Sequence, residues 1–555
     1  MNKKVCSFPI LFALLALLIG TCAVVFPASA QAAPTSIGSI TVSGTVASSY
    51  DAYQIFDANV VDGDSDAKIA TDLAWASDAV RDAALPVLHS AGMPNSQATA
   101  QEAAEWLTTD SHLTSALSAQ LARSLQNSGA VSMALNAGGA AELSCGYWLI
   151  VADDAIAQGE AGTAPIMALV GGSAVTVKPK AATPKVQKHV LEDSTAAWQK
   201  AADATVADDL YWRLSATVPA GLTAYDTYTV RFVDTMSAGL DPSKAAASMR
   251  VYVAAGADGG FDAVSAGKDG RAGTEPAKGW TDITAQCATK VAADGKTFTV
   301  RTGDLIAALG GADAFTAGAR VVAVYNAPLT SACNHGIAKG NPNEVYLRYP
   351  RSPFADQSGD AGFTRTPSDD ACAYTWDLAL TKRGSDGDKP LAGAVLSIAD
   401  DRGRTLAADG TWDAEGKATV TTGEDGRVTV SGVDSGKLEV RELKAPKGYT
   451  AFEGTRSVTV KAEGLDVDQV AAAKPKLTIT AESPLRADSA DGSTGSLEAS
   501  LINTPTGTPP SITTGGFMPS TGDMAMYAAA AAAVAGAALI VVALLVKRGG
   551  GSHKE

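Results

Sequence analysis

Apolar and polar residues follow two different rhythms in the first third of this chain. Residues 36–60 alternate between apolar and polar, which predicts strands because successive side chains of a strand point to opposite faces. Residues 65–127 change to apolar spacings of three and four, which are typical of amphipathic helices. Strand patterns return at 147–151 and 174–178. We therefore expect a mixed α/β N-terminal domain over residues 35–180.

Three helices are expected inside this domain. The first carries its apolar face on Ile69, Leu73, Ala76, Val80 and Ala84. The second begins at Thr99, because Thr99 and Glu102 have the spacing of a capping box, in which each side chain satisfies a backbone amide of the other residue. The third spans residues 113–125, where a leucine occupies every fourth position.

Strand alternation dominates from Pro184 onward. It predicts two further β segments, residues 181–372 and 373–505, so the expected fold class is mainly β behind a mixed α/β domain. Residues 254–274 are rich in Gly, Asp and Ala and are expected to form a surface insertion between strands. Residues 506–517 are rich in Thr, Pro and Gly, a composition that predicts an extended spacer without a core.

The first 30 residues have the order of a secretory signal peptide. A basic start at 2–4 precedes an apolar run at 10–25, and the small residues Ala-Ser-Ala at 28–30 form a cleavage site. We expect the exported chain to begin near Gln31.

The C-terminal end combines a short motif with an apolar run. Met524 to Val546 contains no charge and is long enough to cross a hydrocarbon core of about 30 Å as a helix, with Lys547 and Arg548 as a basic stop behind it. The bland interpretation is a simple membrane anchor. In front of the run stand Met518, Pro519, Ser520, Thr521 and Gly522.

This order of motif, helix and basic tail over residues 518–555 closely resembles the sorting signal of Gram-positive cell-wall proteins. That signal is usually Leu-Pro-x-Thr-Gly, and Met518 replaces its Leu with an apolar side chain of similar size. The resemblance implies that a sortase cysteine attacks the carbonyl group of Thr521. The helix is then left behind, and the protein is passed as an acyl group to an amine.

Composition excludes several functions. The net charge of −15 argues against nucleic acids and anionic membrane surfaces as partners, because both select basic patches. The histidines have no metal-ligand spacing, and nothing resembles a Ser-His-Asp array or a phosphate-binding loop, so we expect no metal, no cofactor and no turnover enzyme. Export permits oxidation, and Cys287–Cys333 is the expected disulfide because both residues fall in one segment; the alternative is buried free thiols.

Each β segment carries a lysine, an acid and an asparagine in phase with an apolar strand face. The first set is Lys188, Asp234 and Asn343. The second set is Lys382, Glu442 and Asn503. A single polar residue in phase is usually a strand end that reaches solvent. Two complete sets, each running from the first strand of its segment to the last, favour a function.

Burial of these groups would change their reactivity. It lowers the pKa of a lysine and raises the pKa of a carboxyl group, so the amine becomes a nucleophile and the protonated acid can polarise the asparagine carbonyl. Held in contact, the amine can attack the side-chain amide and release ammonia. The sequence therefore predicts intramolecular Lys–Asn isopeptide bonds. Unreacted, the same buried polar groups would destabilise the domain unless they were hydrogen-bonded.

The chain resembles the Gram-positive, sortase-assembled pilins that form isopeptide bonds. Residues 184–370 resemble their fimbrial isopeptide-forming D2 domain through Pro184-x-x-x-Lys188, through Val-Asp-Thr-Met-Ser-Ala-Gly-Leu at 233–240 and through Asn-Pro-Asn-Glu-Val-Tyr-Leu at 341–347. Such domains commonly have Gly-Asp where this chain has Ala-Asp at 207–208.

Two further segments carry the resemblance. Residues 374–505 resemble a collagen-adhesin B-type, SpaA-like domain through Pro-Leu-Ala-Gly-Ala at 390–394 and the Glu-Leu-Lys-Ala-Pro-Lys-Gly-Tyr run at 442–449. The N-terminal domain resembles pilin N-terminal domains through Tyr-Gln-Ile-Phe at 53–56 and Gly-Tyr-Trp-Leu-Ile at 146–150.

The resemblance implies tandem Ig-like β-sandwiches with two internal bonds. Lys188 would be joined to Asn343 with the assistance of Asp234, and Asn341 is the alternative acceptor of that bond. In the next domain, the implied bond is Lys382–Asn503, assisted by Glu442.

Pilins of this kind also offer an exposed lysine near the end of the N-terminal domain, often in a Tyr-Pro-Lys-like sequence. Pro179-Lys180 fits that sequence and favours Lys180, whereas Lys178 stands at the aromatic position and is the alternative. The bland interpretation is that both are solvated linker lysines.

Two functions are compatible with these expectations. The first is the shaft subunit of a covalent pilus at the cell surface, in which Thr521 of one copy joins Lys180 or Lys178 of the next; its partners would be sortase, further copies of itself, peptidoglycan and host surface ligands. The second is a monomeric wall-anchored adhesin, or a pilus tip or base subunit, which would have the same domains but no acceptor lysine.

Overall fold

The computed structural model describes residues 37–507, apart from some gaps. These are 45–48, 65–66, 110, 154–159, 161, 163, 180–182, 220–221, 257–278, 316–317, 354 and 356. Several expected features lie outside the described residues: the signal peptide at 1–30, most of the insertion at 254–274, Lys180, most of the spacer, the sorting motif at 518–522 and the apolar run behind it. Within the described part, no helix has both the length and the apolar character needed to cross a membrane.

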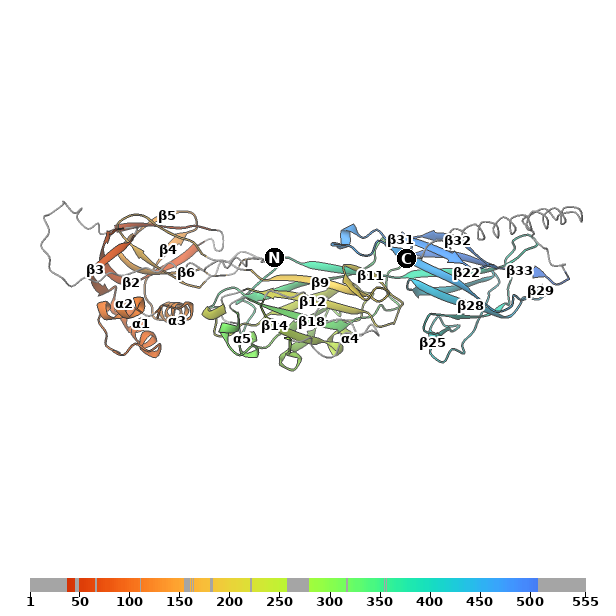
Figure 1. The fold of residues 1–555 in the computed structure, drawn as a ribbon, viewed down its shortest axis with the longest axis horizontal. Helices are drawn as coiled ribbons and strands as arrows, with labels where there is room; N and C mark the ends of the chain where they lie inside the picture. Colours follow the sequence, from red (N-terminus) through yellow and green to blue (C-terminus); the bar gives the residue numbers. More distant parts are fainter. Residues whose placement is uncertain are drawn as a thin grey trace, which may run out of the picture.

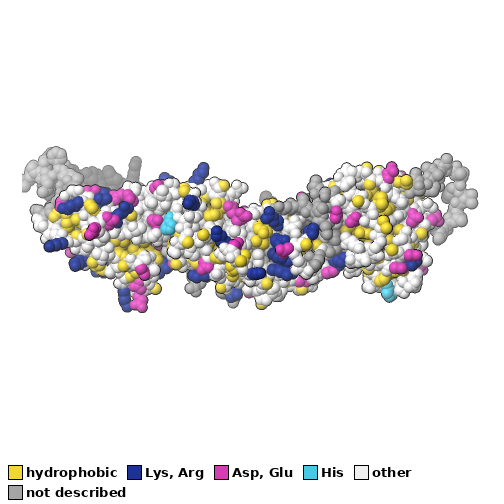
Figure 2. Space-filling model, turned by 180° about the vertical axis from the view of Figure 1, so that it is seen from behind, with side chains coloured by type: hydrophobic (Ala, Val, Ile, Leu, Met, Phe, Trp, Pro, Cys, Tyr) yellow, Lys and Arg dark blue, Asp and Glu magenta, His cyan; other side chains and the backbone are white. Residues whose placement is uncertain are grey.

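The described chain is mainly β, as the alternation predicted, and three bodies of sheet lie in a row along its longest axis (Figure 1). We call them the N-terminal domain (β1–β8), the middle domain (β9–β21) and the C-terminal domain (β22–β33). Acidic and basic side chains are visible on the surface of all three (Figure 2).

The described part of the N-terminal domain contains eight strands and three helices. The strands are β1 (Ile37–Val42), β2 (Ser49–Asp62), β3 (Lys68–Trp75), β4 (Ser132–Asn136), β5 (Ala140–Ser144), β6 (Gly146–Ala152), β7 (Ile166–Val170) and β8 (Val175–Val177). The helices are α1 (Asp78–Ser90), α2 (Ala100–Thr108) and α3 (Ser115–Asn127). The order β3-β2-β6-β7, with β4 paired to β2, forms a five-stranded sheet, and β5-β1-β8 forms a small second sheet.

The central strand β6 is buried on both faces, because a different layer covers each of them. Leu149 packs in the core that the helices share with the sheet, whereas Trp148 and Ile150 pack toward the small sheet. This explains why the sequence of β6 is almost continuously apolar.

The helix predictions are partly confirmed. Thr99 and Glu102 form the expected capping box at the start of α2. The first helix was predicted too early, because Ile69 and Leu73 lie on β3, which pairs with β2. The helix begins only after Ser77, whose side chain caps it by accepting a hydrogen bond from the backbone of Val80.

The middle domain is a sandwich of two sheets. Its strands are β9 (Lys185–Glu192), β10 (Ala197–Gln199), β11 (Ala201–Asp203), β12 (Tyr211–Val218), β13 (Arg231–Met236), β14 (Arg250–Ala255), β15 (Thr281–Asp282), β16 (Ala288–Val291), β17 (Thr297–Arg301), β18 (Ala319–Asn326), β19 (Asn341–Pro350), β20 (Phe363–Arg365) and β21 (Asp369–Tyr374). One sheet has the order β10-β9-β12-β18-β14-β15, and the other has the order β11-β21-β19-β13-β17-β16 with β20 on β19. Short helices α4 (Pro242–Ser248) and α5 (Leu305–Ala308) lie between strands.

The C-terminal domain is a second sandwich. Its strands are β22 (Trp376–Gly384), β23 (Val395–Ala399), β24 (Thr405–Leu406), β25 (Trp412–Asp413), β26 (Val420–Thr421), β27 (Arg427–Val433), β28 (Gly436–Lys444), β29 (Tyr449–Thr450), β30 (Thr455–Glu463), β31 (Lys476–Ala481), β32 (Leu485–Asp491) and β33 (Ser496–Pro505). One sheet has the order β27-β22-β33-β29 with β32 on β33, and the other has the order β25-β24-β23-β28-β30-β31 with β26 on β23.

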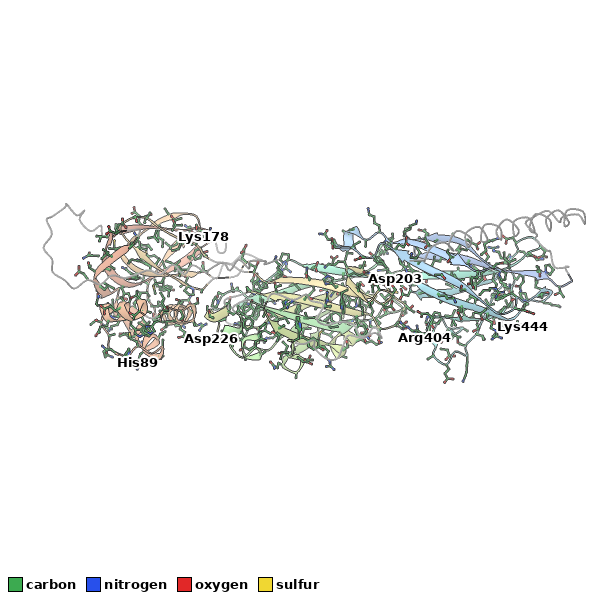
Figure 3. The ribbon with its side chains drawn as sticks, viewed as in Figure 1. His89, Lys178, Asp203, Asp226, Arg404 and Lys444 are labelled. Atoms are coloured by element: carbon green, nitrogen blue, oxygen red, sulfur yellow. The ribbon has the colours of Figure 1, made fainter. Side chains whose placement is uncertain are left out.

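Polar contacts join neighbouring domains. Arg123 on α3 forms an ion pair with Asp226 of the middle domain, and Tyr349 donates a hydrogen bond of 2.8 Å to the backbone oxygen of Glu160. At the other end of the middle domain, the Trp376 indole donates to Asp203 at 2.6 Å. Asp203 and Asp226 lie toward opposite ends of the middle domain (Figure 3).

Candidate functional site

The structure brings Lys188, Asp234 and Asn343 together in the core of the middle domain, where each of them is 0% exposed. Lys188 comes from β9 in one sheet, and the other two come from β13 and β19, which are neighbours in the facing sheet. The Lys188 ammonium group forms an ion pair with Asp234. The set therefore spans the two sheets of the sandwich.

A fourth residue, Tyr325 on β18, contacts all three. Its hydroxyl oxygen lies 2.8 Å from Lys188 Nζ and accepts a hydrogen bond of 3.0 Å from Asn343 Nδ2. The same hydroxyl donates to Asp234 Oδ2 at 2.8 Å. The sequence analysis missed Tyr325, because an inward tyrosine on an apolar strand has the same pattern as any core aromatic residue.

Burial shifts the pKa values of Lys188 and Asp234 in the predicted directions. It lowers the pKa of Lys188 to about 8, although the attraction of Asp234 opposes the shift. It also raises the pKa of Asp234, against the opposing effect of Lys188. The Trp212 and Tyr325 rings lie 5.5 Å from Lys188 Nζ and complete an apolar enclosure. Burial therefore moves both groups toward their neutral forms, an amine beside a carboxylic acid.

Asn341 and Asn343, the two candidate acceptors, have different environments. Asn341 accepts a hydrogen bond from the Asn334 amide at 2.8 Å and donates to the backbone oxygens of Asn334 at 2.8 Å and Ala373 at 3.2 Å. Asn343 faces the lysine site, and its buried Oδ1 has no hydrogen-bond partner among the described residues. The geometry favours Asn343 as the acceptor, because its carbonyl oxygen has no competing hydrogen bond. The side chain of Asn341 is already engaged in hydrogen bonds to the backbone.

The C-terminal domain repeats the arrangement with Lys382, Glu442 and Asn503. The Lys382 and Glu442 side chains are 0% exposed, and their Nζ and Oε1 atoms are 3.4 Å apart. Asn503 donates to Glu442 Oε1 at 2.9 Å and to Oε2 at 3.0 Å. Burial lowers the pKa of Lys382 to about 8, against the attraction of Glu442. As in the middle domain, the asparagine Oδ1 is buried without a hydrogen-bond partner among the described residues.

The two sets differ in how they connect strands. In the C-terminal domain, Lys382 and Asn503 lie on the first and last strands, β22 and β33, which run parallel as direct neighbours. In the middle domain, Asn343 lies on β19, and β20 and β21 follow it. The expectation that each set joins the first strand to the last is therefore wrong for the middle domain, where β21 closes the fold and pairs with β19.

The predicted Cys287–Cys333 disulfide is absent, since both cysteines are free thiols. The thiol of Cys287 donates to the backbone oxygen of Ile283 at 3.3 Å, whereas Cys333 lies near His335, with 3.6 Å between Sγ and Nε2. The two thiols thus have separate local neighbours. Burial raises the pKa of both to about 11, which disfavours the thiolate that oxidation requires.

Of the two candidate acceptor lysines, Lys178 follows β8 directly and is exposed. Figure 3 shows it on the N-terminal domain. Lys180 lies outside the described residues. Exposure fits a lysine that an acyl-enzyme must reach, and it contrasts with the complete burial of Lys188.

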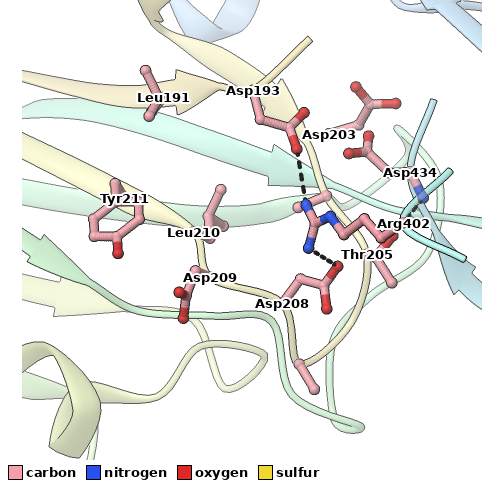
Figure 4. Close-up of a pocket in the computed structure, with 12 residues that line it drawn as sticks. Leu191, Asp193, Asp203, Thr205, Asp208, Asp209, Leu210, Tyr211, Arg402 and Asp434 are labelled. Atoms are coloured by element: carbon pink, nitrogen blue, oxygen red, sulfur yellow. Dashed lines mark hydrogen bonds and ion pairs between the residues drawn. The ribbon is translucent and has the colours of Figure 1, made fainter. Parts of the chain in front are cut away.

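A polar pocket lies at the junction of the middle and C-terminal domains (Figure 4). In it, Arg402 pairs with Asp193 at 3.4 Å and with Asp208 at 2.9 Å. Arg404 also binds Asp208, with two hydrogen bonds of 2.6 and 2.7 Å. Since neither lysine set lines this pocket, we interpret it as a domain contact and not as a site of chemistry.

Comparison with known proteins matches residues 377–474 to the family described as SpaA: prealbumin-like fold domain. This stretch of the C-terminal domain is therefore similar to the SpaA-type domain. The match includes Lys382 and Glu442 and ends before Asn503. A curated relative, the trypsin-resistant surface T6 protein of Streptococcus pyogenes serotype M6, is 30% identical over 129 residues. That alignment covers 22% of this chain and 22% of the relative, so it spans about a fifth of the relative's length.

Several solved structures resemble the chain as well. The T6 backbone pilin of serotype M6 Streptococcus pyogenes is 17% identical with a TM-score of 0.47, over 86% of this chain and 100% of that one. The full-length major pilin SpaD from Corynebacterium diphtheriae is 15% identical with a TM-score of 0.42, over 86% and 100%. The expected resemblance to Gram-positive pilins is confirmed by the match to the SpaA family and by the T6 relative.

Proposed function

We propose that this chain is a structural subunit of a covalent pilus on a Gram-positive cell surface, stabilised by the bonds Lys188–Asn343 and Lys382–Asn503. The observation that carries the proposal is the repeated burial of a lysine, an acid and an asparagine in two successive sandwiches. A turnover enzyme needs a site that substrate can enter. Here the reacting groups are enclosed, so each bond forms once within its own domain.

The chemistry follows from the low pKa values of the two lysines. A neutral amine attacks the asparagine Cγ, and the neighbouring acid assists the transfer of a proton from Nζ to the leaving nitrogen. The Nζ–Cγ bond forms, the Cγ–Nδ2 bond breaks, and ammonia leaves. The enclosure of the lysine, the acid and the asparagine in one core supplies the proximity that an amide otherwise lacks in water.

The mechanical role follows from the strand order of the C-terminal domain. Tension between neighbouring subunits enters at the start of β22 and leaves at the end of β33. Since these two strands are parallel neighbours, such a pull shears the hydrogen bonds between them. A covalent bond between Lys382 and Asn503 would carry this load in place of the hydrogen bonds.

Assembly would use the sorting motif and a lysine that precedes the middle domain. We propose that sortase cleaves the motif at 518–522 and joins Thr521 to Lys178 or Lys180 of another copy, and that the last subunit is passed to peptidoglycan. Such head-to-tail contacts are heterologous and open, so they generate a filament. Host surface ligands would bind the exposed faces of the filament.

Intact mass with peptide mapping tests the internal bonds. We would measure a chain of residues 31–517, which contains every described residue and therefore all of the hydrophobic cores. The expected mass is lower than that of the unmodified chain by two molecules of ammonia, with cross-linked peptides that contain Lys188–Asn343 and Lys382–Asn503. The full unmodified mass would contradict the proposal.

A further inference from the structure

We propose that Tyr325 is a catalytic residue of the middle domain, where its hydroxyl group relays a proton from Lys188 Nζ to Asn343 Nδ2 while the isopeptide bond forms. The inference rests on the proposed bond between these residues. It concerns how the leaving nitrogen obtains its proton, since an amide nitrogen leaves only as ammonia.

The position of the hydroxyl group carries the inference. Its oxygen is 2.8 Å from the attacking nitrogen of Lys188 and 3.0 Å from the leaving nitrogen of Asn343, so one atom is within hydrogen-bond reach of both. The hydroxyl group also donates to Asp234 Oδ2 at 2.8 Å, which fixes it in the centre of the site. Tyr325 is a core residue that is only 1% exposed, so water does not compete for these hydrogen bonds.

The two domains place different groups beside the attacking and leaving nitrogens. In the C-terminal domain, the Glu442 carboxylate itself reaches both nitrogens, at 3.4 Å from Lys382 Nζ and at 2.9 and 3.0 Å from Asn503 Nδ2. Asp234 is shorter than a glutamate by one methylene group. The Tyr325 hydroxyl accepts a hydrogen bond from Asn343 and donates one to Asp234, so it links this acid to the leaving nitrogen.

The proton balance of the step is complete. The Nζ lone pair forms the bond to Cγ, and the electron pair of the Cγ–Nδ2 bond stays on nitrogen. Attack at Cγ ends the conjugation of Nδ2 with the carbonyl group and leaves a lone pair on Nδ2. The Tyr325 hydroxyl then turns from Asp234, gives its proton to Nδ2 and receives one proton from Nζ, so the products are an amide and ammonia, and the tyrosine is unchanged. Burial and the Asp234 carboxylate hold the pKa of Tyr325 well above its ordinary value, so the two transfers occur together without a free phenolate.

A single-atom deletion tests the relay. Tyr325→Phe keeps the ring, which packs edge-to-face against Phe298 with 5.1 Å between centroids, and removes only the oxygen. Chains of residues 31–517 would be made by cell-free translation, quenched in denaturant at set times and analysed by mass and peptide mapping. We expect the Lys188–Asn343 bond to form roughly a hundredfold more slowly, the lower range for the loss of an acid–base group. The rate at which the Lys382–Asn503 bond forms in the same molecule is the internal reference.

Tyr349→Phe is the matched control, because Tyr349 is also buried in this core and its hydroxyl bonds a backbone oxygen, away from the lysine. A Tyr325→Phe chain that links at the rate of the wild type, or a Tyr349→Phe chain that is slowed equally, would overturn the relay. If the wild type itself lacks the Lys188–Asn343 bond, the proposed function fails and not only the relay.

A second substitution separates proton transfer from packing. In the double variant Asp234→Glu with Tyr325→Phe, the longer acid occupies the space of the lost oxygen and reproduces the direct contact made by Glu442. We expect this variant to link faster than Tyr325→Phe alone. A folded double variant, as judged by its melting temperature, that is no faster would overturn the relay, because a direct path to Nδ2 would then not replace the hydroxyl.

Discussion

Asn503 donates its side-chain amide to both carboxylate oxygens of Glu442, at 2.9 and 3.0 Å, inside the core of the C-terminal domain. A third hydrogen bond, from the Phe452 backbone to Glu442 Oε2 at 3.1 Å, fixes the carboxylate from the other side. The acid is therefore positioned against the leaving nitrogen before any bond forms.

Replacing this acid should block the second bond. In Glu442→Gln, the side chain keeps its size but cannot take up or supply a proton, so we expect the Lys382–Asn503 bond to be absent while Lys188–Asn343 forms normally. Intact mass should then show the loss of one ammonia in place of two. Glu439→Gln, an exposed change on the same strand, should leave both bonds intact; if Glu442→Gln does so too, the acid has no role.

The choice between Asn341 and Asn343 can be tested by comparing their alanine variants. Asn343→Ala should remove the bond in the middle domain and lower the free energy of unfolding by about 5 kcal/mol, the chain-entropy value for a cross-link that closes so long a loop. Asn341→Ala should keep the bond and destabilise by about 2–3 kcal/mol, since it leaves buried backbone groups without partners.

Peptide mapping with denaturant unfolding distinguishes these outcomes. A cross-link that survives in Asn343→Ala and disappears in Asn341→Ala would reverse the assignment.

The unlinked variant should also respond to pH differently from the wild type. In Asn343→Ala, Lys188 remains an amine with a pKa of about 8 in the folded state, against about 10.4 when the chain is unfolded. Between these values the unfolded chain binds more protons, so stability should rise with pH from about 8 to about 10.4, by up to about 3 kcal/mol.

In the wild type, Lys188 would be an amide nitrogen and would not titrate. Its stability should therefore rise less over the same range. Urea unfolding at several pH values in this window measures the difference between the two proteins, and parallel curves would show that Lys188 is uncharged or unlinked in both.

Polymerisation should depend on one exposed lysine before the middle domain. If Lys178 is the acceptor, Lys178→Ala should abolish the ladder of high-mass bands that wall extracts show on a denaturing gel; if Lys180 is the acceptor, Lys180→Ala should do so. Lys185→Ala is the matched control, because Lys185 is also exposed and lies a few residues further on. A ladder that survives both substitutions contradicts a shaft built through these lysines, and a single band in the wild type supports the monomeric adhesin.

Strand alternation was sufficient to predict the six groups that meet in the two cores. Lys188 and Lys382 could be recognised in the sequence because a charged residue in phase with apolar neighbours is predicted to be buried. Burial of a charge is unfavourable unless the group is paired or hydrogen-bonded. The site in the middle domain was nevertheless incomplete, because Tyr325 agrees with its apolar strand and therefore gives no signal in the sequence. Only the position of its hydroxyl group, between two sheets, distinguishes it from other core tyrosines.

Other errors come from relations that local patterns do not contain. Ile69 and Leu73 have helical spacing, yet they lie on a strand because β2 offers an edge for pairing. The cysteine pairing assumed that two thiols in one segment would meet, whereas Cys287 and Cys333 lie beside different loops of the domain.

The last prediction concerns Ala207, the residue at which this chain departs from the Gly-Asp that similar domains commonly have. Ala207 has φ of +70°, a left-handed conformation that costs a residue with a Cβ about 1–2 kcal/mol. Its methyl group is exposed, so removing it loses little packing. Its backbone amide donates to Leu329 at 2.9 Å, and the next residue, Asp208, binds Arg404 across the domain junction, so the turn must keep this shape.

Ala207→Gly should therefore stabilise the middle domain, because the relief of strain exceeds the extra entropy that glycine gives the unfolded chain. The expected net gain is roughly 0.5–1 kcal/mol. Thermal unfolding measures it, and Ala79→Gly is the control: Ala79 is exposed in the first turn of α1, where the same change should destabilise by up to about 1 kcal/mol. If both substitutions destabilise alike, the turn at Ala207 is not strained, and the alanine there does not destabilise the turn that positions Asp208.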